Sequence, residues 1–450
     1  MTRRYTELMP WGPGPIGPES KVMPRCRCLP GLRENENVSR LRMNRRNWMM
    51  LSGAGLAMRP GGSQPLGAAP DSALDSVLPD QLLLKDYRPK SIYKIPVSDI
   101  KKAKYPAIDC HHHAQSKTPE QVDEEVRIMD AAGLESSVVF PAVGQGPVYR
   151  AEVFDNICKI YSRYPKRFYI YCGIDMRGMG QPGWQETAIA ELERCHKMGA
   201  VGVGEIHDKG MGIGGVMGGP PNWQGTRSRG GGGAGPQQRA PVQGCHPDSP
   251  QLDEIWEKCA DLGMPINLHV SDPYWSYLPQ NRFNDGLMNG FSWRLDNKPG
   301  IMQHNELILS YEAAAKRHPR TVFISSHLAN LDYDLDRLGG IFERNPNFYA
   351  DFSARFHETA TIPRFTAQFL QKWAHRVTYG TDIPFSPHLF SLTYRILEST
   401  DEHFYDQDFY FNFNYHWPMY GMGLSDDILK KVYRETALNA FKQARSKARG

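Results

Sequence analysis

Several histidines and one aspartate of this sequence have the types and spacing of a metal centre. His111 and His113 stand two apart after an apolar run, so on a strand they face the same side, as two ligands of one metal ion must, and His112 faces the other. Three further polar side chains end other apolar runs: His269, His327 and Asp382. Histidine nitrogens with one carboxylate suit zinc or a similar first-row ion and leave one coordination position open.

An open position on such a metal predicts a definite chemistry. A bound divalent ion lowers the pKa of coordinated water to about 7 and polarises a carbonyl group, and a further histidine beside it can move protons. Taken singly, each residue has a plainer interpretation. A histidine at a strand end is commonly a hydrogen-bonded structural residue, and Asp382, with Pro384 soon after, fits a turn or a helix cap. Their joint occurrence favours a site.

Short apolar runs alternate with helix-period segments from residue 105 onward, which is typical of βα units around a parallel sheet. A clear helical segment is 250–262, where Leu252, Ile255, Trp256 and Cys259 recur at helical steps. The expected strands are 107–110, 136–140, 168–172, 200–205, 265–269, 321–325, 347–351 and 376–379. Eight units predict a (β/α)8 TIM barrel, with an open doubly wound sheet as the alternative; in a barrel all C-terminal strand ends meet at one mouth.

Two stretches interrupt this rhythm. Residues 210–235, after the fourth strand, hold 12 glycines in 26 positions and predict a flexible insertion, either a lid or a passive loop. No GK[ST] sequence accompanies the glycines, which excludes a phosphate-binding loop. Residues 272–304, after the fifth strand, are rich in aromatic side chains and are expected to cover a pocket.

Residues 1–80 are predicted to be a leader rather than part of the folded body, which we expect at 81–450. Residues 1–42 are rich in Pro, Gly and Arg without hydrophobic periodicity, and Met43 is a better start. Arg45-Arg46 precede an apolar stretch, so 43–58 resembles a twin-arginine export signal; a chance arginine pair is the alternative. Residues 59–80 read as a linker. An export signal predicts a periplasmic protein; without one the protein is expected in the cytoplasm.

Composition excludes several classes of protein. A 450-residue chain with 40% hydrophobic and 23% charged residues is globular, and it has no apolar run long enough for a membrane helix. The net charge of +4 arises in residues 1–60, which hold 11 Lys/Arg against 4 Asp/Glu, while the remainder has 42 against 45. The folded body therefore offers no basic surface for nucleic acid. Eight scattered cysteines without a CxxC pair argue against a disulfide framework or a cysteine zinc site.

The ordered set of motifs resembles the amidohydrolase superfamily, in the branch that includes aminocarboxymuconate-semialdehyde decarboxylase. The resemblance covers about residues 105–445. The matching pieces are Asp109-Cys110-His111-His112-His113, Leu268-His269, His318-Pro319-Arg320 with Phe323-Ile324-Ser325-Ser326-His327, Tyr349-Ala350-Asp351-Phe352-Ser353-Ala354-Arg355, and Tyr379-Gly380-Thr381-Asp382-Ile383-Pro384.

The resemblance implies a role for each residue. It implies a metal-dependent (β/α)8 barrel with His327 as general acid/base and four metal ligands: His111, His113, His269 and Asp382. Many binuclear relatives carry a bridging lysine on the fourth strand, but this strand has Glu205, so we expect a mononuclear site. Glu205 either bridges a second metal or bonds to its neighbours. Arg355 either clamps a substrate carboxylate or pairs with an acid such as Asp351 or Glu358.

Three functions follow as hypotheses. The first is hydrolysis of an amide, ester or lactone bond of a small molecule, in which Asp382 and His327 transfer the proton. It uses one divalent metal ion, for which zinc is expected before manganese or iron. The second is non-oxidative decarboxylation of a small hydroxy or keto acid by the same residues. The third is a binding barrel that has lost its chemistry, against which the complete ligand set argues. The resemblance alone suggests a homodimer.

Overall fold

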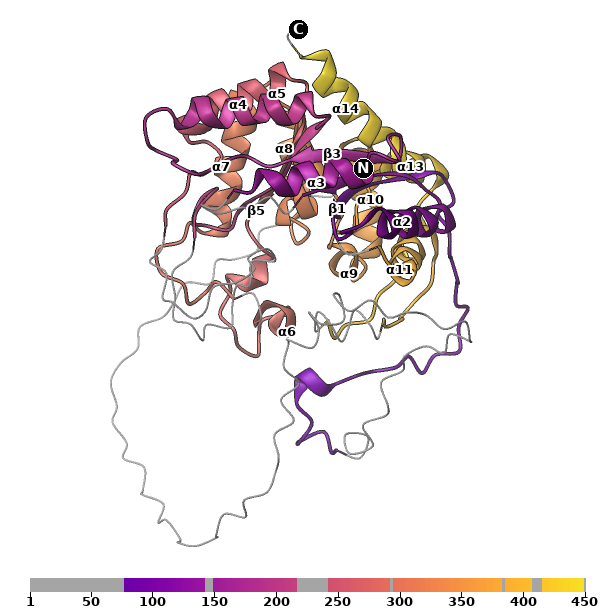
Figure 1. The fold of residues 1–450 in the computed structure, drawn as a ribbon. Coiled ribbons are helices and arrows are strands. Elements are labelled where there is room, and N and C mark those ends of the chain that lie inside the picture. Colours follow the sequence, from indigo (N-terminus) through magenta and orange to yellow (C-terminus); the bar gives the residue numbers. More distant parts are fainter. Residues whose placement is uncertain are drawn as a thin grey trace, which may run out of the picture. The chain divides into compact units, whose positions relative to one another are not determined.

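The computed structural model describes residues 77–141, 149–216, 242–291, 294–382, 385–406 and 415–448 (Figure 1). The predicted leader up to residue 76, including the export-signal segment 43–58, lies outside the described residues, as do residues 217–241, which include most of the glycine-rich stretch 210–235. None of the described helices is both long and apolar enough to cross a membrane.

Eight parallel strands, one for each predicted run, form a single sheet in the order β1 to β8. Two backbone hydrogen bonds join the last strand region to the first: Cys110 N–H donates to Tyr379 O at 2.9 Å, and Asp382 N–H donates to His111 O at 2.7 Å. The strands are β1 Ala107–His113, β2 Leu134–Phe140, β3 Phe168–Cys172, β4 Gly202–Asp208, β5 Ile266–Val270, β6 Phe323–Ser325, β7 Phe348–Asp351 and β8 Val377–Thr378. The sheet therefore closes into the predicted (β/α)8 barrel, and the open-sheet alternative is wrong.

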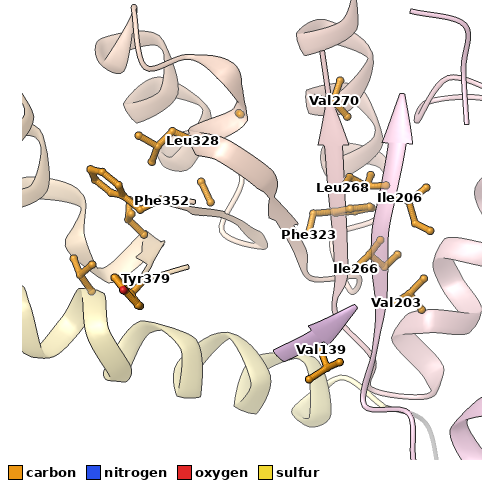
Figure 2. Packing of buried hydrophobic residues seen from close by; sticks show 14 of the residues in the cluster. Val139, Val203, Ile206, Ile266, Leu268, Val270, Phe323, Leu328, Phe352 and Tyr379 are labelled. Carbon is orange, nitrogen blue, oxygen red and sulfur yellow. The ribbon is translucent and has the colours of Figure 1, made fainter. Parts of the chain in front are cut away.

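Both faces of the strands are buried, which is why they read as apolar runs in the sequence. Figure 2 shows side chains of β4, such as Ile206, beside Leu268 and Val270 of β5. On the inner side, Ile108, Val138, Tyr171, Ile324 and Tyr349 form a second buried cluster. This packing fixes the strand register and hence the residues that reach the mouth of the barrel.

Helices alternate with the strands around the barrel (Figure 1). Their ends follow local sequence rules: Thr118 caps α2 by accepting from Gln121 N–H, and Gly133 ends it at a φ of 79°. The helices are α2 Pro119–Ala132, α3 Ala151–Tyr161, α4 Trp184–Lys197, α5 Asp253–Asp261, α6 Leu287–Gly290, α7 His304–Arg317, α8 Leu335–Arg344, α9 Phe356–Thr359, α10 Pro363–Trp373, α11 Pro387–Glu398, α13 Asp426–Lys430 and α14 Thr436–Ser446.

The C-terminal helix closes one end of the barrel. The last helical region of the chain consists of α13 and α14 joined by a π-helical turn, Lys431–Glu435. Side chains of α14, including Ala440 and Phe441, pack in the same cluster as Ile108 and Ile324 of the barrel interior. Side chains of α14 thus fill this end of the barrel, while the strands terminate at the opposite end.

The two insertions start in an ordered way. The bases of the glycine-rich insertion pair as antiparallel bridges, Ile213 with Cys245 and Val216 with Val242. The aromatic segment after β5 contains a short helix, η3 Tyr274–Ser276, and α6. Its Tyr274 ring stacks on Tyr333, at a centroid distance of 4.3 Å.

The mouth of the barrel has an unusual backbone. Non-glycine residues take left-handed φ angles after four strands: Ser271 after β5, residues 327–330 after β6, Ala354 after β7 and Asp382 after β8. Residues 327–330 are consecutive, with φ between 52° and 59°. Each such residue costs about 1–2 kcal/mol, so surrounding contacts must hold these turns in place.

Candidate metal centre

The carboxyl end of β1 supplies two histidines to the mouth of the barrel. The Nε2 atom of His111 lies 3.5 Å from Glu205 Oε1 and 3.4 Å from Asp382 Oδ1. The Nε2 atom of His113 lies 3.2 Å from Glu205 Oε2 and 3.2 Å from Asp382 Oδ1. The ring of His112 lies on the other side of the strand, against Phe385 at 4.0 Å, as the alternation predicts.

Glu205 of β4 lies at the centre of the histidines. Its Oε1 atom accepts a hydrogen bond from His269 Nδ1 at 3.0 Å, and its Oε2 atom lies 2.6 Å from His207 Nε2. We call His111, His113, Glu205 and Asp382 the mouth cluster; one potential ligand atom from each lies within 4.8 Å of all the others. The side chain of Glu205 is 3% exposed, so this carboxylate is shielded from water and surrounded by imidazole rings.

His327 reaches the same place from the left-handed turn η5 Ser326–Asn330 after β6. Its Nδ1 atom donates to the carbonyl oxygen of Ser353 at 3.0 Å and also lies 2.9 Å from the hydroxyl of Ser353. Its Nε2 atom lies 3.2 Å from His269 Nδ1 and 3.8 Å from Asp382 Oδ2. His327 is thus beside the mouth cluster, at a distance suited to proton transfer through one water.

The electrostatics of the site divide its histidines into two kinds. Burial opposes charge on His111, but Asp351, Glu205 and Asp382 outweigh it and raise the pKa well above its usual value. Burial likewise opposes charge on His113, yet Asp382 and Glu205 raise its pKa to about 9. For His327 and His207 burial dominates and lowers the pKa of each to about 4. These last two are neutral at pH 7, whereas the mouth cluster attracts positive charge.

The residues fit a divalent cation. The buried Nε2 atom of His111 has no hydrogen-bond partner among the described residues, although it faces two carboxylates. Two imidazole nitrogens and two carboxylates in one small volume are the donors that zinc and its first-row neighbours take. The side chains of His113 and Asp382 are 31% and 19% exposed, so one side of the cluster faces outward.

The structure brings together six of the residues singled out in the sequence: His111, His113, Glu205, His269, His327 and Asp382. Glu205 lies in the mouth cluster, while His269 lies behind Glu205 and contacts it through Nδ1. The sequence placed Glu205 on the fourth strand, and in the structure it lies near the carboxyl end of β4, which runs to Asp208.

Arg355 lies apart from this group. Its side chain is 6% exposed and is held by two buried acids, with Nε 3.3 Å from Asp332 Oδ1 and Nη1 3.6 Å from Glu358 Oε1. It also donates to the carbonyl of Ala354 and to Asn330. Of the two partners named from the sequence, Glu358 is in contact, and Asp351 bonds to His111 instead. Asp332 was not foreseen.

Comparisons with known proteins agree with this architecture. The family model described as amidohydrolase matches residues 108–443, and no curated protein sequence matches the chain. Among solved structures the chain is similar to 2,6-dihydroxybenzoate decarboxylase from Rhizobium (19% identity, 75% of this chain and 99% of that one, TM-score 0.44). It is also similar to a putative amidohydrolase from Staphylococcus aureus (14%, 75% and 99%, 0.44) and to 4-oxalomesaconate hydratase from Rhodopseudomonas palustris (14%, 76% and 97%, 0.43).

Proposed function

Since this chain belongs to the amidohydrolase family and is therefore an enzyme of hydrolase or carboxy-lyase type, we propose that it hydrolyses a C–N or C–O bond of a small molecule. The bond is that of an amide, ester or lactone. The cofactor is one divalent metal ion, and zinc is our first choice for it. The observation that carries the proposal is the mouth cluster, in which His111 Nε2 is buried, faces Glu205 and Asp382, and has no hydrogen-bond partner in the part of the chain that the structure describes.

His111, His113, Glu205 and Asp382 would hold the metal, with His269 behind Glu205. When bound there, a divalent ion supplies a Lewis acid that lowers the pKa of a coordinated water to about 7 and polarises a carbonyl oxygen. The chain's own residues handle the protons. The carboxylate of Asp382 accepts a proton from the attacking water, and His327 Nε2, 3.8 Å from Asp382 Oδ2, receives it and returns it to the leaving group.

The buried ion pairs of Arg355 bear on the choice of reaction. Decarboxylation needs a group that holds the departing carboxylate, and Arg355 was the candidate for that clamp. Its guanidinium is already held by Asp332 and Glu358 and is almost fully buried. A substrate carboxylate would have to displace one of these acids, which supports hydrolysis as the first choice.

The experiment is a metal analysis of the purified full chain followed by an activity screen. We expect about one equivalent of metal, zinc or after exchange manganese, and turnover within a panel of esters, lactones and amides. The variant H111A/H113A should lose both. Release of CO2 from a hydroxy or keto acid, with no hydrolysis, would replace the hydrolase proposal by a carboxy-lyase. No uptake of zinc or manganese on titration would overturn the metal-dependent mechanism.

A further inference from the structure

Asp351, the last residue of β7, is fully buried and bonds to several groups around the mouth cluster without belonging to it. Four residues donate hydrogen bonds to it: His111 of β1, Asn267 of β5, His327 of the turn after β6, and Ser353 of the loop after β7. The pattern of these bonds points to what it does.

One carboxylate oxygen of Asp351 faces His111. The Oδ2 atom lies 2.8 Å from His111 Nδ1 and also accepts from Asn267 Nδ2 at 3.1 Å. The amide of Asn267 is itself oriented, because its oxygen accepts from Ser326 Oγ at 2.7 Å. A carboxylate can only accept, so the neutral form of His111, which is the form that can bind a cation, carries its proton on Nδ1 and presents a lone pair at Nε2. That Nε2 is buried and has no hydrogen-bond partner among the residues described in the structure.

The other oxygen of Asp351 holds the turn that carries His327. The Oδ1 atom accepts from His327 N–H at 2.9 Å and from Ser353 N–H at 3.2 Å, and the hydroxyl of Ser353 donates to it as well. His327 has a left-handed φ of 59°, which needs such support. With its hydrogen given to Asp351, the Ser353 hydroxyl accepts from His327 Nδ1, as the Ser353 carbonyl does.

We propose that Asp351 is a positioning residue that fixes the tautomer of His111 and the backbone of His327, so that both rings present Nε2 lone pairs to the mouth. This inference rests on the proposed function, because the lone pair of His111 then serves a cation. Partners of this kind, which bond to the far nitrogen of a histidine ligand, usually contribute about 10–100-fold to metal affinity.

The test uses the full chain with Asp351→Asn, matched to Asp175→Asn. Asp175 is equally a buried carboxylate, but its side chain bonds to Arg177 after β3, and no hydrogen bond of its carboxylate within the described residues reaches the mouth cluster. Two readouts are taken: the tautomer of neutral His111 by nitrogen-15 NMR of metal-free, histidine-labelled protein, at a pH high enough to deprotonate the ring, and the affinity for Zn²⁺ by competition with a chelator. We expect Nδ1–H in the wild type, a shift toward Nε2–H in Asp351→Asn, and about 10–100-fold weaker Zn²⁺ binding in that variant alone.

The outcomes separate this inference from the proposed function. An Nε2–H tautomer of His111 in the metal-free wild type overturns the inference, and this spectrum needs no variant that folds poorly. Equal Zn²⁺ affinity of Asp351→Asn and Asp175→Asn overturns it as well. If the wild type takes up no Zn²⁺ but the tautomer shifts as expected, the role of Asp351 stands and the metal-dependent function fails.

Discussion

Two clusters of histidine and acidic side chains in this barrel differ in how their charges are balanced. The outer cluster, Asp253, Glu257, His318 and Arg320, joins α5 to the segment before β6. Both nitrogens of His318 are bonded there, at 2.8 Å to Glu257 and 3.0 Å to Asp253. Arg320 contacts Glu257 at 2.5 Å and also Asp261 at 2.7 Å. Each carboxylate of the outer cluster is more than a quarter exposed, so water and arginine together balance it.

The mouth cluster has the same residue types in a different balance. The ion pairs of Glu205 within the described residues are made with histidines, and its side chain is 3% exposed. Buried carboxylates need a compensating positive charge, because burial without one costs several kcal/mol. The comparison teaches that a histidine next to an acid is no sign of a metal site by itself. The sign is a buried carboxylate beside an imidazole nitrogen that lacks a hydrogen bond.

Removing the two β1 histidines should have the largest effect on the difference in metal binding between the two clusters. H111A/H113A should reduce the metal content of the purified protein from about one equivalent to none, because half of the donors are lost. Elemental analysis after gel filtration measures this. H318A is the matched control in the outer cluster and should keep its metal. A loss of metal in H318A would erase the distinction between the clusters.

Neutralising the central carboxylate should weaken metal binding strongly without changing side-chain volume. Glu205→Gln should lower the affinity for Zn²⁺ by about 100-fold, since a charged donor inside the histidine cage is removed. Glu257→Gln, the same change in the outer cluster, should leave the affinity unchanged. Competition with a chelator measures both. Equal affinities of the two variants would show that Glu205 only bonds to its neighbours.

Metal affinity should rise with pH. Because Asp382 and Glu205 raise the pKa of His113 to about 9 in the metal-free protein, a cation must displace a proton at any lower pH. Affinity should therefore increase by about tenfold per pH unit for each proton released, up to about pH 9. Calorimetry in buffers of different ionisation enthalpy counts the protons. A pH-independent affinity with no proton release would contradict the charge assigned to His113.

The raised pKa of His113 also predicts how the stability of the metal-free protein changes with pH. Because the pKa of His113 is raised, protonation of His113 stabilises the folded protein. This stabilisation is complete when the pH is below 6.5, the usual pKa of histidine, and it is lost as the pH rises through about 9. Thermal unfolding of metal-free protein across this range should show a falling midpoint. In H113A the fall should be smaller.

The smallest effect on the metal, but a clear one on the fold, is expected in the outer cluster. H318A should lower the free energy of unfolding by about 1–3 kcal/mol, because a buried side chain with two hydrogen bonds is removed. Denaturant unfolding measures the change, with Zn²⁺ affinity as the parallel readout. No loss of stability would mean that the outer cluster contributes little to the packing of α5.

The strands could be predicted from the sequence because parallel strands are buried on both faces and read as continuous apolar runs. Once eight runs were counted, the barrel topology itself placed His111, His269, His327 and Asp382 at one mouth. The arrangement within the mouth was less accessible. The contact of Asp351 with His111 joins residues 240 positions apart, and nothing local in the sequence marks it.

Backbone conformation was the other part that the sequence did not reveal. Left-handed φ angles usually indicate glycine or asparagine, yet His327, Leu328 and Ala329 adopt them here. Hydrogen bonds from elsewhere hold the turn: Asp351 accepts from His327, and Asn330 donates to the carbonyl of Val270 at 3.0 Å. Tertiary contacts of this kind override local preference, and they lie where the proposed chemistry is.

The seam between the first and last strands has a consequence for how the protein is made. Asp109 and Thr381, 272 positions apart, bond across it, and Asp382 N–H donates to His111 O beside them. During synthesis the β1 histidines leave the ribosome long before Asp382 does. A nascent chain therefore has no complete set of donors until nearly all of the barrel has been translated, and metal loading belongs to the finished chain.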